Sequence, residues 1–256
     1  MARRGERAAS LGSRAVQVGF LLGILALWYL ATNRWGVNRL LLPNPIAVWQ
    51  QLLDVLKTGE FWPDLRITLT ELVAAFALSM TFGTIVGFFV SRTRYTIGVF
   101  DPLFAGIYSI PIILFLPLYI LFFGLGPASK IALGATISFF PIVLSTIAGF
   151  GNVDRTLVTA AKSMGASNYQ LFRYVLVPAA LPVILSGLRM GFTIALLAII
   201  GSEVIASLAG LGHHIVQLAE GMDMARMFAY IAFVVVIAGL LNGIVSFLEA
   251  RGRRRI

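Results

Sequence analysis

Long apolar stretches separated by short polar segments dominate the pattern along this chain. A helix needs about 20 residues to cross roughly 30 Å of hydrocarbon at its normal rise per residue. Six stretches reach that length, near residues 15–32, 66–90, 97–123, 129–150, 181–207 and 227–248. The pattern therefore predicts an all-α integral membrane protein with six transmembrane helices.

The first apolar stretch has two interpretations. Four arginines precede it, as in a secretory signal. Its apolar run from Ala15 to Ala31 is longer than that of a usual signal, and Trp28 and Tyr29 resemble a membrane-interface anchor more than a cleavage site. We therefore expect this stretch to be retained as a helix.

Lysine and arginine are unevenly distributed among the segments between the spans. Thirteen of them fall in segments 1–14, 91–96, 151–180 and 249–256. Only four fall in the segments on the opposite side. The excess of positive charge marks the cytoplasmic side, so both termini are predicted to be cytoplasmic. The expected organisation is a basic cytoplasmic tail at 1–14 and a single transmembrane domain at 15–256.

Composition agrees with a membrane location. Hydrophobic residues make up 59% of the 256 positions and charged residues 12%, against about a quarter in soluble domains. A net charge of +9 would suggest nucleic acid in a soluble protein, but the basic residues cluster at both termini, which indicates topology and no nucleic-acid partner. The absence of cysteine excludes disulfides, thiolate metal sites and cysteine nucleophiles.

The segments between the spans are too short to form a soluble domain, which takes about 50 residues. Within 33–65, the turn signal Pro43-Asn44-Pro45 precedes apolar residues at helical spacing, with polar residues opposite. This pattern predicts a short amphipathic helix on the membrane surface.

No nucleotide-binding motif supplies energy for transport. A P-loop needs glycine before a Lys-Ser or Lys-Thr pair, but Lys162-Ser163 follows Ala161. Uphill transport would need a separate subunit or an ion gradient. Ion-driven carriers hold ionisable groups within the membrane. The candidates here are Glu71, Arg189 and Glu203, with no relay visible among them. An ion-gradient-driven transporter therefore stays as an alternative.

Small residues four apart recur within the spans and allow two helix backbones to approach closely. Such pairs suit either packing within the bundle or a dimer interface. They are Gly19/Gly23, Gly83/Gly87, Gly187/Gly191 and Gly239/Gly243.

Pro111 and Pro117 interrupt the third apolar stretch. Each removes a backbone donor and kinks a helix. Carbonyl groups freed at membrane depth need protein or water partners, so the kinked helix either lines a cavity or bends for packing alone.

Segment 151–180 carries helix signals for two short helices. Asn152 or Asp154 can cap the first, and Gly165 can close it. Ser167-x-x-Gln170 matches a capping box that begins the second helix, which we expect to end before Pro178.

The first of these helices is nearly bare on one side. Ala160, Ala161 and Gly165 leave little side chain beside the bend. Such a surface either enters a groove on another protein or is an ordinary helical hairpin, because alanine is a good helix former.

The same segment resembles a known family. Thr159-Ala160-Ala161-x3-Gly165-x9-Val175-Leu176-Val177-Pro178 is similar to the Glu-Ala-Ala-x3-Gly-x9-Ile-x-Leu-Pro loop of permease subunits in binding-protein-dependent ABC importers. The stretch from Pro111 to Gly126, and Glu203 with Gly210-Leu211-Gly212, are similar to the sulfonate, taurine, nitrate and bicarbonate branch. The family's leading Glu is replaced by Thr159. This removes a carboxylate that could form a salt bridge or hydrogen bond to the ATPase or within the loop.

The resemblance implies a non-catalytic subunit in a bacterial plasma (inner) membrane. Two copies of a cytoplasmic ATP-binding subunit would hold ATP and Mg, with no cofactor on this chain. A second permease chain, by symmetry an identical one or else a different permease, and an external substrate-binding protein would complete the assembly within membrane lipid. The implied ATPase-coupling residues are Thr159, Ala160, Ala161, Met164, Gly165 and Ala166.

The implied substrate is a small polar, often anionic solute, such as a sulfonate, nitrate or taurine. The candidates for the pathway wall are Ser109, Pro111, Pro117, Thr136 and Glu203.

An intramembrane hydrolase is a weaker alternative. It needs a serine and a histidine base within the membrane, but the two histidines, His213 and His214, fall in a predicted external loop. Together with Glu220 and Asp223 they match no zinc spacing. We therefore predict neither a catalytic nor a metal site.

Overall fold

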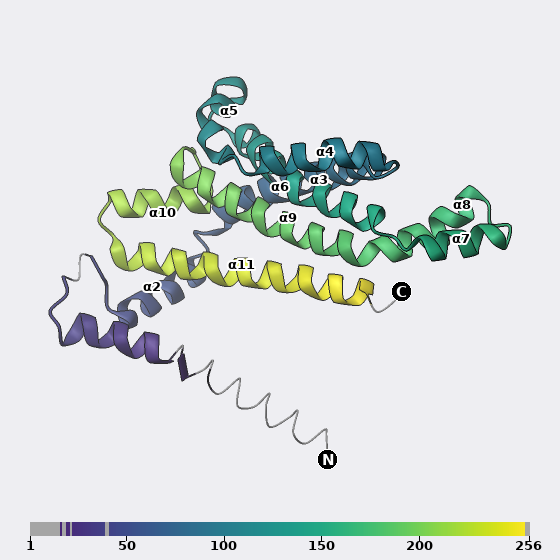
Figure 1. Ribbon diagram of the computed structural model, residues 1–256. Coiled ribbons are helices and arrows are strands. Elements are labelled where there is room, and N and C mark those ends of the chain that lie inside the picture. The colour runs from purple at the N-terminus through teal and green to yellow at the C-terminus, as the bar shows by residue number, and fades with distance from the viewer. Residues whose placement is uncertain (1–15, 17–18, 21, 39–40, 254–256) are drawn as a thin grey trace, which may run out of the picture. The chain divides into compact units, whose positions relative to one another are not determined.

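The computed structural model of the chain describes residues 16, 19–20, 22–38 and 41–253 (Figure 1). Within these ranges the regular structure is helical and contains no β-strand, which confirms the all-α prediction. The predicted basic tail at 1–14 lies outside the described residues.

The helices follow one another with short connections. In chain order they are α2 (Pro45–Thr58), α3 (Trp62–Val90), α4 (Arg94–Tyr108), η1 (Ile112–Phe115), α5 (Leu116–Phe123), α6 (Pro127–Gly151), α7 (Arg155–Ser163), α8 (Asn168–Leu171), η2 (Phe172–Leu176), α9 (Val177–Ile205), α10 (Leu211–Glu220) and α11 (Met224–Arg253).

Four helices of the described chain are long and apolar enough to cross a membrane. They are Trp62–Val90, Pro127–Gly151, Asn168–Ile205 and Met224–Gly252. The pair Arg94–Tyr108 and Ile112–Phe123 adds a fifth span if it is counted as one broken helix. The first apolar stretch is described as the shorter helix Leu22–Asn33. The six-span count and the cytoplasmic termini therefore stay predictions.

The chain divides into two compact units, and each is described here by itself. The first comprises Met1–Phe61 and Ile215–Phe233. It contains α2, which confirms the predicted helix after the Pro43-Asn44-Pro45 turn. Asn44 caps α2 by accepting a 2.9 Å hydrogen bond from the Ile46 N–H, and Gly59 ends it at a φ of 70°.

The second unit comprises Trp62–His214 and Val234–Ile256. Within it α6 packs against both α3 and α9. Glycines make this close approach possible. A Cβ atom added at Gly87 would lie 2.6 Å from the Cβ of Thr146, and one at Gly191 would lie 2.5 Å from the Cγ1 of Ile142. The bundle-packing interpretation therefore holds for the pairs that contain these two glycines.

The other glycine pairs differ. A Cβ at Gly239 or Gly243 in α11 would meet no heavy atom within 4 Å, and the same is true of Gly19 and Gly23. Packing within the described chain therefore does not explain these two pairs.

The third apolar stretch is broken more sharply than a proline kink. Its two halves differ in direction by 71°. Pro111 precedes the 3₁₀ turn η1, and Pro117 lies in the first turn of α5. Proline is tolerated in a first turn because no intrahelical donor is needed there. Each proline thus begins a new helical segment.

The expected helix end before Pro178 is wrong. The helical stretch continues from Asn168 through the π-turn η2 into α9 and ends at Ile205. Pro178 lies in the first turn of α9, directly after the π-turn. The π-turn shifts the hydrogen-bond pattern by one residue, and a first-turn proline costs no intrahelical bond.

Candidate functional site

The segment between α6 and α9 forms two short helices with defined caps. Asp154, rather than Asn152, caps α7, because its Oδ1 accepts a 2.8 Å hydrogen bond from the Thr156 N–H. This bond lowers the pKa of the exposed Asp154 carboxyl below its ordinary value. The charged carboxylate also suits the positive end of the α7 dipole.

The bend after α7 depends on one glycine. Gly165 has a φ of 78°, a left-handed conformation that favours glycine. The predicted capping box follows it. Gln170 Oε1 accepts from the Ser167 N–H at 2.8 Å, and the Ser167 hydroxyl accepts from the Gln170 N–H at 3.3 Å. The chain therefore turns from α7 into α8 in a locally determined geometry.

The six predicted coupling residues lie together at this bend. Met164 is 87% exposed, Ala160 is exposed, and a Cβ at Gly165 would meet nothing within 4 Å. Ala161 and Ala166 are half-buried and share a 3.1 Å backbone hydrogen bond. The result is an exposed tip of small side chains around one large apolar residue.

Thr159 occupies the position of the family's Glu. Its hydroxyl donates a 2.9 Å hydrogen bond to the Arg155 carbonyl one turn earlier in α7. The side chain is therefore bonded within its own helix.

The opposite end of α9 carries a polar cluster that fixes the start of α10. Glu203 is 1% exposed and its Oε2 accepts a 2.8 Å hydrogen bond from the Gly212 N–H. The Leu211 N–H donates to the Thr68 hydroxyl at 3.0 Å, and the Gly210 N–H donates to Asp64 Oδ1 at 3.1 Å. We call these three side chains, Asp64, Thr68 and Glu203, the α10 anchor.

The anchor also explains the Gly-Leu-Gly sequence. A Cβ at Gly210 would collide with the Glu203 carboxylate, and Gly210 has a φ of 108°. A Cβ at Gly212 would lie 2.7 Å from the Cβ of Glu203. Both glycines are required by the close approach of the backbone to a buried carboxylate.

Further ionisable side chains surround Glu203. Glu71 is 1% exposed and interacts electrostatically with Glu203. Lys130 is fully buried, attracts both carboxylates electrostatically, and donates a hydrogen bond to the Leu125 carbonyl. The sequence showed no relay among the candidates, but Glu71 and Glu203 lie in one buried cluster, and Glu203 is bonded across helices to Thr68. Lys130 and the anchor residues Asp64 and Thr68 were missed, because no local pattern links positions so far apart in sequence.

The remaining ionisable candidate, Arg189, lies apart from that cluster. Its Nη1 is 3.4 Å from Glu249 Oε2 in α11. Glu249 also accepts a 3.3 Å hydrogen bond from the Ser186 hydroxyl. Arg189 therefore connects α9 with the end of α11.

The other predicted pathway residues are distributed around the broken third stretch. Ser109 is exposed and its hydroxyl donates to the Gly106 carbonyl at 2.7 Å. Pro111 and Pro117 are exposed beside it in sequence. Thr136 in α6 accepts a 2.9 Å hydrogen bond from the Tyr119 hydroxyl of α5 and lines a cavity of about 290 Å³ with Ser79. Thr136 is thus a polar group at an open surface.

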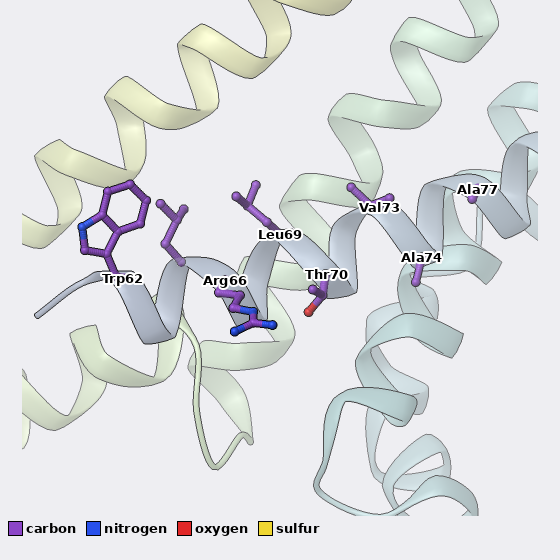
Figure 2. Close-up of a pocket in the computed structure, with 8 residues that line it drawn as sticks. Trp62, Arg66, Leu69, Thr70, Val73, Ala74 and Ala77 are labelled. Atoms are coloured by element: carbon purple, nitrogen blue, oxygen red, sulfur yellow. The ribbon is translucent and has the colours of Figure 1, made fainter. Parts of the chain in front are cut away.

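A larger cavity of about 700 Å³ runs along α3. Figure 2 shows that its lining side chains follow one helix from Trp62 to Ala77. Arg66 and Thr70 are the polar members of this lining. A mostly apolar surface on a membrane-spanning helix suits lipid or another helix better than a polar solute.

The described residues include no group of three or more His, Asp or Glu side chains that could hold a metal ion. His214 instead pairs with the anchor, because its Nδ1 lies 3.3 Å from Asp64 Oδ2. His214 lies in α10 rather than in a loop, and this contact joins α10 to α3.

Known proteins similar to this chain are permeases. The family described as binding-protein-dependent transport system inner membrane component matches residues 79–254. The taurine transport system permease protein TauC of Escherichia coli (strain K12) is 32% identical over 232 residues, which cover 89% of this chain and 84% of that protein. The putative aliphatic sulfonates transport permease protein SsuC of Bacillus subtilis (strain 168) is 29% identical, covering 89% and 83%.

Solved structures share the fold. The inward facing MetNI methionine ABC transporter includes a chain that superimposes with a TM-score of 0.60 at 20% identity. The match covers 75% of this chain and 94% of that one. The location in a bacterial inner membrane, inferred from the family resemblance, agrees with these relatives. This chain therefore belongs to the family of binding-protein-dependent transport system inner membrane components, the membrane subunits of ABC importers.

Proposed function

We propose that this chain forms the solute pathway of an ATP-driven importer and is driven through α7 by a separate ATPase subunit. The observation that carries the proposal is the exposed tip at the α7–α8 bend. An 87% exposed methionine flanked by small residues is costly in water and suits a complementary groove. ATP and Mg would be held by the partner, and this chain would contribute no catalytic residue.

The hydrogen bonds that cap α7 and α8 support a mechanical role for this segment. Asp154 and the Ser167–Gln170 box fix both short helices from within the segment. The second of them continues without a break into the spanning helix. A displacement at the tip would therefore reach α9 through helical backbone rather than through a loose loop.

The proposed assembly contains two ATPase copies, a second copy of this chain and an external binding protein. The open faces at Gly239 and Gly243 support the second copy, because small residues allow two membrane helices to approach closely. A pathway between two bundles also requires no hollow channel inside either of the small bundles.

The proposed substrate is a small anionic solute of the sulfonate class. The names of TauC and SsuC support this class. Ser109, Pro111, Pro117 and Thr136 remain the proposed wall of the pathway. Glu203 belongs to the proposal as the residue that holds the α10 end of the pathway, since its carboxylate is bonded to protein groups.

Ala160→Trp tests the coupling, with Lys162→Trp as the matched control. Both positions are exposed on α7. At about 100° per residue they lie roughly 160° apart around the helix. We expect Ala160→Trp to lower taurine uptake and ATP hydrolysis stimulated by the binding protein by about tenfold or more, as for the loss of a well-packed contact. Lys162→Trp is expected to keep both activities.

Two results would contradict the proposal. One is normal uptake by Ala160→Trp in vesicles that contain the assembled importer. The other is accumulation of taurine by this chain without an ATP-hydrolysing partner, with collapse on adding an ionophore. That second result would establish the ion-gradient alternative.

A further inference from the structure

A cavity of about 950 Å³ lies behind α7. Its lining comes from the end of α3, the start of α4, the end of α6, and from α7, α8 and η2. All these segments belong to the second compact unit. We propose that this cavity is a binding site for the headgroup of an anionic phospholipid.

The charge of the lining is positive. Arg92, Arg94 and Arg155 contribute to it, and no aspartate or glutamate does. None of these three guanidinium groups forms an ion pair with a carboxylate in the described part of the chain. Unpaired arginines around one cavity match a phosphate group, which accepts hydrogen bonds from planar guanidinium donors.

Aromatic rings complete the lining on its apolar side. Phe88, Phe150 and Phe172 contact one another, with ring centroids 5.3 to 6.3 Å apart. The guanidinium carbon of Arg92 lies 5.3 Å from the centroid of the Phe88 ring. A lining that combines arginine with aromatic carbon suits a molecule with a phosphate and an acyl chain better than a free phosphate.

The position of the cavity agrees with a lipid ligand. It lies at the ends of helices α3 and α6, which are long enough to span the membrane. The charge distribution predicts that these ends are cytoplasmic. Anionic lipids give the cytoplasmic leaflet its negative surface potential, which attracts basic residues next to the spans.

The start of α4 adds to the attraction. This helix begins at Arg94, so the positive end of its dipole lies beside the cavity lining, whereas that of α7 is already capped by Asp154. The neighbouring Asp154 carboxylate is exposed and accepts from the Thr156 N–H. The site therefore keeps its positive character beside one acidic residue.

The site lies on the opposite side of α7 from the exposed tip. Arg155 and Val158 line the cavity, whereas Ala160 and Met164 belong to the tip. At about 100° per residue, Ala160 lies roughly 140° from Arg155 and 160° from Val158 around the helix. A bound lipid would therefore support α7 from behind. This consequence for coupling rests on the proposed function, but lipid binding itself does not.

The test measures lipid retention by the full chain in the absence of an ATPase. The purified protein is exchanged into nanodiscs of phosphatidylcholine and phosphatidylglycerol, released, and examined for retained lipid by native mass spectrometry. We expect wild type to retain phosphatidylglycerol in preference. Arg92→Gln and Arg155→Gln should each lower that retention by about fivefold, the effect of one basic residue at an anionic membrane surface.

Matched variants distinguish binding in the cavity from a nonspecific effect of positive charge on lipid retention. Arg173→Gln removes an exposed arginine of η2 that does not line the cavity, and it should retain lipid like wild type. The double variant Arg92→Lys/Arg155→Lys keeps the charge and should retain most of the lipid, which also serves as the folding control.

Two outcomes overturn the proposal. Retention by Arg92→Gln/Arg155→Gln equal to that of wild type would show that the cavity is not the site. Complete displacement of phosphatidylglycerol by excess glycerol phosphate would assign the site to a free phosphate instead. Because no ATPase is present, neither outcome bears on whether α7 docks on one.

Discussion

The hydroxyl of Thr68 donates a 2.7 Å hydrogen bond to the carboxylate of Glu203, which lies 135 positions later in the chain. The same hydroxyl accepts from the Leu211 N–H, and the same carboxylate accepts from the Gly212 N–H. Two side chains from different helices thus satisfy successive amides at the start of α10. Buried amides without such partners would be costly.

The α10 anchor predicts a strong effect of Glu203→Ala. The substitution leaves the Gly212 N–H and the Thr68 hydroxyl without their acceptor. We expect a loss of about 2–6 kcal/mol in the free energy of unfolding, since each of the two unsatisfied buried groups costs about 1–3 kcal/mol. Thermal unfolding of the purified chain in detergent would measure it. Glu220→Ala is the control, because Glu220 is exposed at the end of α10, and an equal loss in both variants would contradict the prediction.

Alanine substitutions at two glycines should have opposite effects. Gly212→Ala places a Cβ 2.7 Å from the Glu203 Cβ and the Ile200 carbonyl oxygen. Such overpacking costs about 1–3 kcal/mol. In the separated monomer, Gly239→Ala in α11 meets nothing within 4 Å, and alanine favours a helix over glycine by about 1 kcal/mol. Melting temperatures of both variants as monomers would show the difference. In the proposed dimer the same Gly239→Ala substitution should be destabilising, because the second copy needs small residues on that face for close approach.

The sequence predicted the features whose causes are local. The capping box of Ser167 and Gln170 was predicted because both partners lie within one helical turn. Pro111 and Pro117 indicated the interrupted third stretch for the same reason. The α10 anchor was not predicted, because Asp64 and Thr68 come together with Glu203 only after α3 packs beside α9.

The cap of α7 should respond to pH. The hydrogen bond from the Thr156 N–H lowers the pKa of Asp154 below its ordinary value. The contribution of the cap is therefore fully present above the ordinary pKa and is lost as pH falls through the lowered one, below about pH 4. Hydrogen exchange of the first-turn amides should become faster in wild type than in Asp154→Asn on acidification, because asparagine caps a helix without titrating.

A contrasting result is expected for Asp154→Ala. Its first-turn amides should exchange faster than those of wild type already at neutral pH, because the acceptor is absent. Exchange rates that do not differ among the three proteins at any pH would show that Asp154 does not stabilise α7.

The contact between Arg189 and Glu249 should contribute little. The arginine side chain is 52% exposed and the separation is 3.4 Å. Exposed ion pairs contribute about 0.2–1 kcal/mol. A double-mutant cycle with Arg189→Gln and Glu249→Gln should therefore give a coupling energy of about 0.5 kcal/mol in thermal unfolding. A coupling energy several times larger would mean that this pair holds α9 and α11 together.

Pro178 shows where local reasoning failed. Proline usually follows a helix end, so the sequence placed an end before it. The structure places a π-turn at Phe172–Leu176 and begins α9 at Val177. Whether a proline ends one helix or lies in the first turn of the next depends on backbone geometry that its neighbours do not encode.

The continuous helical stretch Asn168–Ile205 links the bend after α7 to the segment that precedes α10. It contains 38 residues, and at 1.5 Å per residue it is about 57 Å long, well beyond the thickness of the hydrocarbon layer. Its first turn carries the capping box, and its last turn carries Glu203. A rotation of its first turn would have to pass the π-turn at Phe172–Leu176 and Pro182, which lies inside α9, before it could reach the buried carboxylate of Glu203.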